Sequence, residues 1–190
     1  MTNQKILYLD MDGVLCNFEK ALYNLFPHIL DMPEGSEERA KEVDRCCESE
    51  KGHRIFRDLE LVPGAIWAYK QLIKHYFVHI LSTAMWGVPH SFMDKRLWVE
   101  KNLGPDAFKR LNLSHNKGLF RGDYLIDDRL KNGVEWFQGE HIHFGQPDFR
   151  TWLQTICYLS KKDGWEMEEP PEELKTYFSK GHHIAKLNVP

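Results

Sequence analysis

The sequence lacks any long hydrophobic run, and no stretch reaches the roughly 18 to 20 apolar residues that a transmembrane helix needs. Its first residues, Met-Thr-Asn-Gln-Lys, contain no apolar core of the kind found in export signals. Neither sign of charge dominates, since the formal net charge is -3, and this argues against a broad surface for nucleic acid or for anionic membranes. We therefore expect a cytoplasmic protein that binds neither nucleic acid nor membranes.

Cysteine is scarce, with 4 residues among 190, and none has the Cys-x-x-Cys spacing of common metal sites. Free thiols in a reducing cytoplasm are the expected state, and we interpret the vicinal pair Cys46–Cys47 as helix residues rather than a redox device. Ten histidines invite a zinc hypothesis, but a zinc site needs three or four converging ligands. No acid or thiol is spaced to complete one around His141 and His143 or the tail pair His182–His183, so zinc is not predicted.

What the sequence contains is the pattern of an ordinary globular α/β protein. Hydrophobic residues make up 42% and charged residues 28% of the chain, and 190 residues suffice for one α/β domain with a small insertion. Short β-rich runs alternate with helical periodicity, which predicts a parallel, doubly wound, Rossmann-like sheet. The predicted strands are 6–10, 76–81, 111–113, 124–126 and 142–144. The predicted helices are 18–30 (ended or kinked by Pro27), 36–50, one from about 65 to 73, 91–103, 148–159 and a short one at 172–178.

The elements divide the chain into three parts. Residues 1–16 and 61–160 are predicted to form the catalytic core, because they contain all five strands. Residues 17–60 carry two helical patterns and no strand, which predicts a small helical cap inserted after the first strand. Residues 161–190 form a polar C-terminal extension.

Polar side chains follow the strands of the core. Asp10 and Asp12 end the first strand, and residues two apart start on the same side of a strand. Ser82 and Thr83 end the second, Lys117 follows the third, and Asp127–Asp128 ends the fourth. The carboxyl ends of parallel strands share one edge of the sheet, where ligands bind. Asp12-Gly13 is also a common turn dipeptide, so a surface turn remains the alternative for the first stretch taken alone.

Together these residues suit phosphoryl transfer. A carboxylate can attack phosphorus and form an aspartyl-phosphate, and a second acid can protonate the leaving group and then activate water. A hydroxyl and an ammonium group can hold the remaining phosphate oxygens. Oxygen ligands favour Mg²⁺ as the cation that neutralises charge between the acids and the phosphate.

The order of these motifs resembles the haloacid dehalogenase (HAD) superfamily of phosphohydrolases. The stretch Asp10-Met-Asp-Gly-Val-Leu-Cys-Asn-Phe-Glu19 is similar to the opening of the 5'(3')-deoxyribonucleotidases. So are Val62-Pro-Gly-Ala65, Trp98-Val-Glu-Lys101 with Gly104-Pro105, and Tyr124-Leu-Ile-Asp-Asp-Arg129. The resemblance spans roughly residues 5 to 160. It implies a Mg²⁺-dependent phosphomonoesterase whose substrate is a nucleoside monophosphate.

The resemblance also implies roles for the acids. Asp10 would be the nucleophile and Asp12 the general acid/base. Asp10, the backbone carbonyl of Asp12 and Asp128 would ligate Mg²⁺, with Asp127 as a supporting carboxylate or alternative ligand.

Further positions would contact the substrate. Ser82 matches the hydroxyl that grips phosphate, and Lys117 and Lys95 match phosphate-side lysines. Phe18 matches an aromatic residue that faces the nucleoside, and Phe56 lies where the insertion supplies apolar cover. Thr83 adjoins Ser82 and is a further candidate for contact with the substrate. Trp86 lies in the loop that follows Ser82-Thr83, and its side chain could serve either in loop packing or in substrate contact.

The sequence leaves the substrate open, because the family's usual Thr-Ser-Pro after the second strand is Ser82-Thr83-Ala84 here. Arg57 and Asp58 follow Phe56 where an aromatic wall is expected, and His115 precedes Lys117. A sugar phosphatase, a non-catalytic binding module with the same fold, and action on the terminal phosphate of an oligonucleotide are the alternatives. The oligomeric state is also open, with a homodimer among the expectations.

Overall fold

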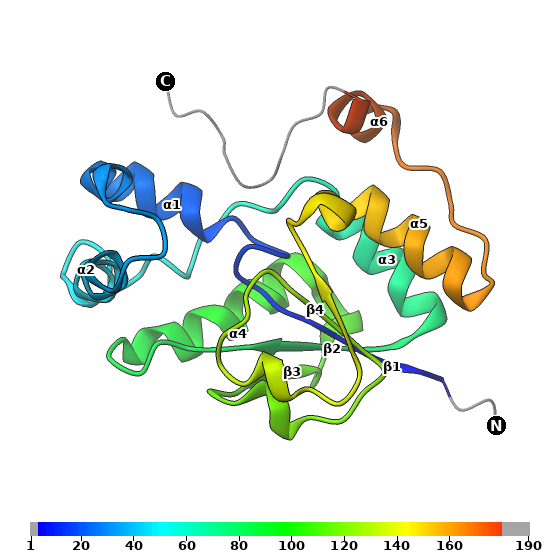
Figure 1. The fold of residues 1–190 in the computed structure, drawn as a ribbon, viewed down its shortest axis with the longest axis horizontal. Helices are drawn as coiled ribbons and strands as arrows, with labels where there is room; N and C mark the ends of the chain where they lie inside the picture. The colour runs from blue at the N-terminus through cyan, green and yellow to red at the C-terminus, as the bar shows by residue number, and fades with distance from the viewer. Residues whose placement is uncertain (1–3, 180–190) are drawn as a thin grey trace.

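The computed structural model describes residues 4–179, and its core is a parallel five-stranded sheet with the strand order β3-β2-β1-β4-β5 (Figure 1). The predicted Rossmann-like α/β fold with a helical insertion after the first strand is confirmed. The strands are β1 (Ile6–Leu9), β2 (Phe77–Ser82), β3 (Leu111–Leu113), β4 (Tyr124–Asp127) and β5 (Glu140–His143). The helices of the core are α3 (Ala65–His75), α4 (Pro89–Leu103) and α5 (Trp152–Asp163), and its 3-10 turns are η2 (Gly104–Ala107), η3 (Lys117–Leu119), η4 (Val134–Trp136) and η5 (Pro147–Phe149).

The strand order has its switch point at β1. The chain runs outward from β1 to β2 and β3 and then returns to the other side of β1 as β4 and β5. Ligands of open α/β sheets bind at such a point, outside the carboxyl ends of the strands. The acids that follow β1 and β4 therefore lie beside each other.

The two faces of the sheet are covered differently. Helices α3, α4 and α5 pack on one face, where Leu9 and Ile80 belong to the main apolar cluster. On the other face Tyr8 and Leu125 pack with Val134 of η4 in a smaller cluster, and this side carries short 3-10 turns in place of α-helices (Figure 1). Successive strand residues point to opposite faces, which explains why neighbours in β1 join different clusters.

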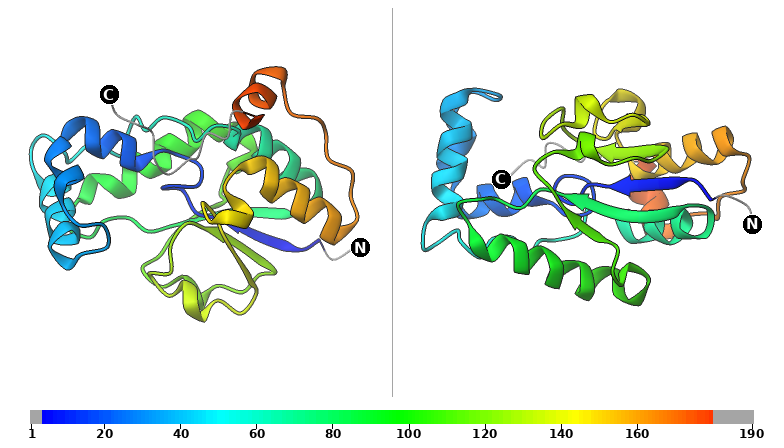
Figure 2. Two further views of the ribbon diagram at one scale, coloured as in Figure 1. Left: turned by 45° about the horizontal axis from the view of Figure 1, so that its top comes forward. Right: turned by 90° about the horizontal axis from the view of Figure 1, so that it is seen from below.

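The helical insertion lies beyond the carboxyl end of β1 (Figure 2). Asn17 caps α1 by accepting a hydrogen bond from the backbone N–H of Lys20, and Ser36 caps α2 in the same way. A cap supplies an acceptor for an N–H that has no partner inside the helix. The elements of the insertion are α1 (Phe18–Leu25), the 3-10 turn η1 (Pro27–Asp31) and α2 (Glu37–Glu48).

Several element boundaries differ from the predicted ranges, and local sequence explains the largest differences. The helical pattern over 18–30 is interrupted at Pro27 as predicted: α1 ends at Leu25, and Pro27, which has no N–H to donate, starts a 3-10 turn. The last core helix starts at Trp152 rather than near residue 148, because Thr151 forms a capping box with Gln154. Strand β5 begins at Glu140, two residues early, because an edge strand tolerates the polar Glu140 and His141.

The C-terminal extension packs on the core as far as the structure describes it. The Trp165 indole donates to the Tyr76 hydroxyl at 2.9 Å and stacks on His75. Helix α6 (Glu172–Ser179) brings Phe178 against Gly64. The tail pair His182–His183 lies outside the described residues, and the three sequence-derived domain ranges stay predictions. Among residues 4–179, no helix has the length and apolarity to cross a membrane.

Trp98 anchors the end of the insertion to α4, and its substitution is a test of this packing. Its indole is 1% exposed and donates to the Leu59 carbonyl at 2.7 Å. Trp98→Phe leaves that buried carbonyl without its donor, so we expect a loss of about 1 to 3 kcal/mol in the free energy of unfolding. Urea denaturation measures it.

The matched control is Trp136→Phe, because Trp136 is 61% exposed and should change stability by no more than about 0.5 kcal/mol. Equal effects of the two substitutions would contradict the anchoring role of Trp98.

Candidate active site

A cleft of about 620 Å³ opens at the carboxyl ends of β1, β2 and β4 and is walled on one side by the insertion. This is where the sequence places the site. The cleft is lined by nine of the eleven predicted site residues: Asp10, Asp12, Phe18, Phe56, Ser82, Thr83, Trp86, Lys117 and Asp127. Of the other two, Lys95 contacts Asp12 and Ser82, and Asp128 has an oxygen within 4.8 Å of those of Asp10 and Asp127.

Lys117 lies between two carboxylates from neighbouring strands. The backbone N–H of Asp10 donates to the Ile126 carbonyl at 2.9 Å, which prolongs the β1–β4 pairing and brings Asp10 beside Asp127. The Lys117 ammonium lies 2.9 Å from Asp10 Oδ1 and 2.5 Å from Asp127 Oδ2. Burial alone would lower the pKa of Lys117, but the two carboxylates outweigh it and raise this pKa. Lys117 therefore stays cationic.

Lys95 makes an equivalent link on the other side of the cleft floor. It is fully buried on α4, and its ammonium lies 2.5 Å from Asp12 Oδ2 and 3.2 Å from Ser82 Oγ. The same ammonium lies 4.8 Å from the centre of the Phe56 ring, a cation–π contact that offsets part of its desolvation. Asp12 and Ser82 are thus fixed relative to each other by one charge.

The acids Asp10, Asp127 and Asp128 form a group that can hold a metal ion. Each offers an oxygen within 4.8 Å of the others. Burial, with nearby Asp10 contributing, raises the pKa of Asp127 to about 6 and that of Asp128 to about 8. Asp128 Oδ1 is buried and has no hydrogen-bond partner, whereas both oxygens of Asp127 are engaged, by Lys117 and by the Arg129 N–H. Uncompensated negative charge and a free buried oxygen fit a hard divalent cation.

The backbone of this acid pair is held by the two histidines of β5. The Nε2 atom of His141 lies 3.1 Å from the Asp127 carbonyl, and that of His143 lies 3.0 Å from the Asp128 carbonyl. Burial lowers the pKa of His141, which keeps its ring neutral with one N–H to donate. These alternating histidines therefore position the acids.

Gly13 makes room for Asp128. Its φ is +77°, a conformation that favours glycine. A Cβ at Gly13 would lie 2.3 Å from Asp128 Oδ2. The side-chain Nε of Arg129 lies 3.6 Å from Asp128 Oδ2.

Two aromatic rings form the apolar wall of the cleft. Phe18 and Phe56 stack with ring centres 5.2 Å apart and planes inclined by 5°. Trp86 is 82% exposed at the rim and meets His115 edge to face. The Thr83 hydroxyl donates to the Ser114 carbonyl at 2.8 Å, so it is already engaged. Arg57, which stands where the family resemblance predicts an aromatic wall, is not among the lining residues.

Some residues that line the cleft were not predicted from the sequence. Asp44 and Glu48 of α2 reach the cleft, as do Lys131 and Asn132 from the loop after β4. The i,i+4 spacing of Asp44 and Glu48 marks one face of the helix, but nothing in the sequence says that this face borders the site. Glu48 packs so closely on Gly87 that a Cβ there would lie 1.9 Å from its Oε1.

The raised pKa of Asp128 predicts a pH-dependent stability. A carboxyl whose pKa rises on folding binds more protons in the native state, so without metal the free energy of unfolding falls as pH rises from about 4 to about 8. Asp128→Asn removes this loss, and its stability relative to wild type should increase from pH 5 to pH 8 in the presence of a chelator. Thermal unfolding at several pH values measures the difference. The exposed Asp148→Asn is the control, and a difference independent of pH would contradict the assignment.

The family described as "5' nucleotidase, deoxy (Pyrimidine), cytosolic type C protein" matches residues 4–165. A Vibrio phage KVP40 protein, provisionally named 5'(3')-deoxyribonucleotidase, is 44% identical over 162 residues, covering 85% of this chain and 88% of that protein. The human 5'(3')-deoxyribonucleotidase, cytosolic type, is 31% identical over 155 residues, covering 72% of this chain and 77% of the human one.

Among solved structures, a Bacillus subtilis protein assigned as a HAD-hydrolase and solved with magnesium shares the fold. It superposes with a TM-score of 0.55 at 14% identity and covers 83% of this chain and 99% of its own. The predicted resemblance to the HAD deoxyribonucleotidases is confirmed, and with it the assignment as a hydrolase of phosphoric monoesters. The chain belongs to the 5' nucleotidase, deoxy (pyrimidine), cytosolic type C family.

Proposed function

We propose that this protein is a Mg²⁺-dependent 5'(3')-deoxyribonucleotidase that removes phosphate from nucleoside monophosphates through an aspartyl-phosphate. One observation carries the proposal: two buried lysines separate Asp10 from Asp12 by pairing each acid with a different cation. Lys117 holds Asp10 against Asp127, and Lys95 holds Asp12 near Ser82. A reaction with one nucleophilic and one proton-transferring carboxylate needs such a separation.

The reaction has two steps on this chain's own residues. An oxygen of Asp10 attacks phosphorus, the bond from phosphorus to the ester oxygen breaks, and Asp12 gives its proton to the departing alkoxide. In the second step Asp12 takes a proton from water as the water oxygen attacks phosphorus, which releases inorganic phosphate and restores Asp10. Lys117, Lys95 and Ser82 hold the phosphate oxygens throughout.

The acidic group supports the cation part of the proposal. Asp10 and Asp128 would hold Mg²⁺, with the Asp12 carbonyl as a further ligand and Asp127 as the supporting acid, because Asp128 keeps a free oxygen while Asp127 has none. When bound, the ion neutralises charge between the carboxylates and the phosphate.

The cleft supports a nucleoside as the leaving group. Its volume lies within the range of small-molecule sites, and the stacked Phe18–Phe56 pair offers an apolar surface beside the catalytic acids. The names of the phage and human relatives point the same way. We place its activity in the cytoplasm, as the name of the human relative does for that protein. The homodimer remains a prediction.

Replacing the nucleophile tests the mechanism. Asp10→Asn keeps the size of the side chain but cannot attack phosphorus, so we expect kcat to fall by at least about a thousandfold with Mg²⁺ and an aryl phosphate. Asp148→Asn, at an exposed position outside the cleft, should keep full activity. Wild-type turnover by Asp10→Asn would rule out this nucleophile, and wild-type activity unaffected by a chelator would rule out the metal.

A panel of esters tests the substrate class. We expect kcat/KM for deoxyribonucleoside 5'- and 3'-monophosphates to exceed that for sugar phosphates by about tenfold or more. The reason is that a nucleobase can pack its flat face against the Phe18–Phe56 wall, whereas a sugar phosphate has no such ring. Phe18→Leu should reduce this preference while leaving hydrolysis of a small aryl phosphate within a few fold. Equal rates across the panel would leave a phosphatase of another specificity, and no hydrolysis at all would favour a binding module.

A further inference from the structure

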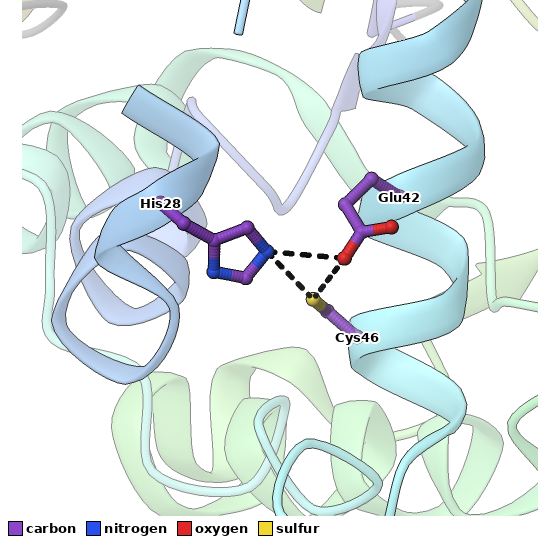
Figure 3. A group of neighbouring side chains, drawn as sticks. All are labelled: His28, Glu42 and Cys46. Atoms are coloured by element: carbon purple, nitrogen blue, oxygen red, sulfur yellow. Dashed lines mark hydrogen bonds and ion pairs between the residues drawn. The ribbon is translucent and has the colours of Figure 1, made fainter. Parts of the chain in front are cut away.

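A second cluster of metal-ligating side chains lies in the helical insertion, apart from the catalytic acids (Figure 3). It joins His28 of η1 to Glu42 and Cys46, which lie one turn apart on α2. His28 Nε2 lies 3.0 Å from Glu42 Oε1 and 3.9 Å from Cys46 Sγ, and the two α2 ligand atoms are 3.7 Å apart. One nitrogen, one oxygen and one sulfur thus form a small triangle.

The triangle has the dimensions of a zinc site. Ligands that hold zinc tetrahedrally at about 2.0 to 2.3 Å lie roughly 3.3 to 3.6 Å from one another, within a few tenths of an ångström of these distances. Thiolate and imidazole select zinc over Mg²⁺ or Ca²⁺, which prefer oxygen alone. One carboxylate and one thiolate also balance the two charges of the ion.

The three side chains are buried on one side and reached by water on the other, as a metal site with a water ligand requires. Cys46 is 6% exposed and the Glu42 side chain 19%, whereas the His28 side chain is 54% exposed, so one side of the triangle is open to water. Without metal, burial and Glu42 raise the pKa of the Cys46 thiol. A cation would reverse this shift and release the thiol proton.

Helix α2 has little apolar surface with which to pack on the rest of the insertion. The buried side chains of this helix are only Cys46 and Cys47, and the rest of the helix is strongly polar. Small segments with so little apolar surface are commonly stabilised by a metal or by cross-links. A metal held by these three residues would tie η1 to α2 and so orient the helix that carries Asp44 and Glu48 into the cleft.

We propose that His28, Glu42 and Cys46 bind one zinc ion, with water in the fourth position, and that this ion joins η1 to α2. The site contains no residue of the catalytic cleft, so it stands independently of the proposed reaction.

Titration with Co²⁺ tests the proposal, because a cobalt–thiolate bond gives a near-ultraviolet charge-transfer band that a carboxylate site cannot give. The full chain is titrated under reducing conditions with saturating Mg²⁺ present, so that the catalytic acids do not compete. We expect one equivalent of Co²⁺ to develop the band, and Zn²⁺ to displace it. Cys46→Ser should abolish the band, and His28→Gln, at a half-exposed side chain, should weaken Co²⁺ binding at least about tenfold. Cys157→Ser, at a free thiol outside the cluster, is the matched control and should bind as wild type does.

Thermal unfolding gives a second readout. Zn²⁺ at about a hundredfold above its dissociation constant should raise the unfolding temperature of the wild type by about 5 °C and leave Cys46→Ser unchanged. A band that is absent in wild type, or that survives in Cys46→Ser, would overturn the proposal, as would an equal thermal shift in both proteins.

Discussion

Three carboxylates with oxygens within 4.8 Å of one another at the ends of β1 and β4, two buried and one half-buried, are the constraint on which the site depends. Like charges at this separation and with little water cannot all ionise without a counter-charge. Lys117 compensates Asp10 and Asp127 directly, and the β5 histidines hold the backbone of the acid pair. Asp128 keeps an oxygen without a partner. Asp10, Asp127 and Asp128 together carry more negative charge than Lys117 and Arg129 neutralise, which is the physical argument for the proposed metal.

The second lysine gives two acids that are only two residues apart different surroundings. Asp10 continues the sheet and faces Lys117, whereas Asp12 lies past the strand end and faces Lys95 of α4. The position of Lys95 depends on the packing of α4, which two contacts attach to the insertion. The Trp98 indole donates a hydrogen bond to the Leu59 carbonyl, and Asp94 forms an ion pair with Arg54 at 2.7 Å. The contacts that attach the insertion therefore also fix the cation beside Asp12.

The parts of the molecule that follow local rules were predictable from the sequence. A buried strand followed by an acid, repeated along the chain, led to the sheet and to Asp10, Asp12 and Lys117 at one edge. Side chains that reach the cleft from the insertion were not predictable, because Asp44 and Glu48 depend on how α2 docks rather than on any local pattern. The contact of His28 with Cys46 was unpredictable for the same reason. These residues are 18 positions apart, and only the packing of η1 on α2 brings them together.

Helix α2 has two distinct polar faces, one toward the cleft and one toward η1. Two positions along a helix turn the side chain by about 200°, so Glu42 and Cys46 point away from Asp44 and Glu48. With almost no apolar surface to bury, the helix is oriented by polar contacts: Arg39 donates to the Met32 carbonyl at 3.1 Å and to the Tyr23 hydroxyl, and Glu42 meets His28. These contacts lie outside the carboxylate cluster, so they orient α2 without involving Asp10 or Asp12. The side chains that α2 brings to the cleft are in this way held by contacts separate from those that hold the acids.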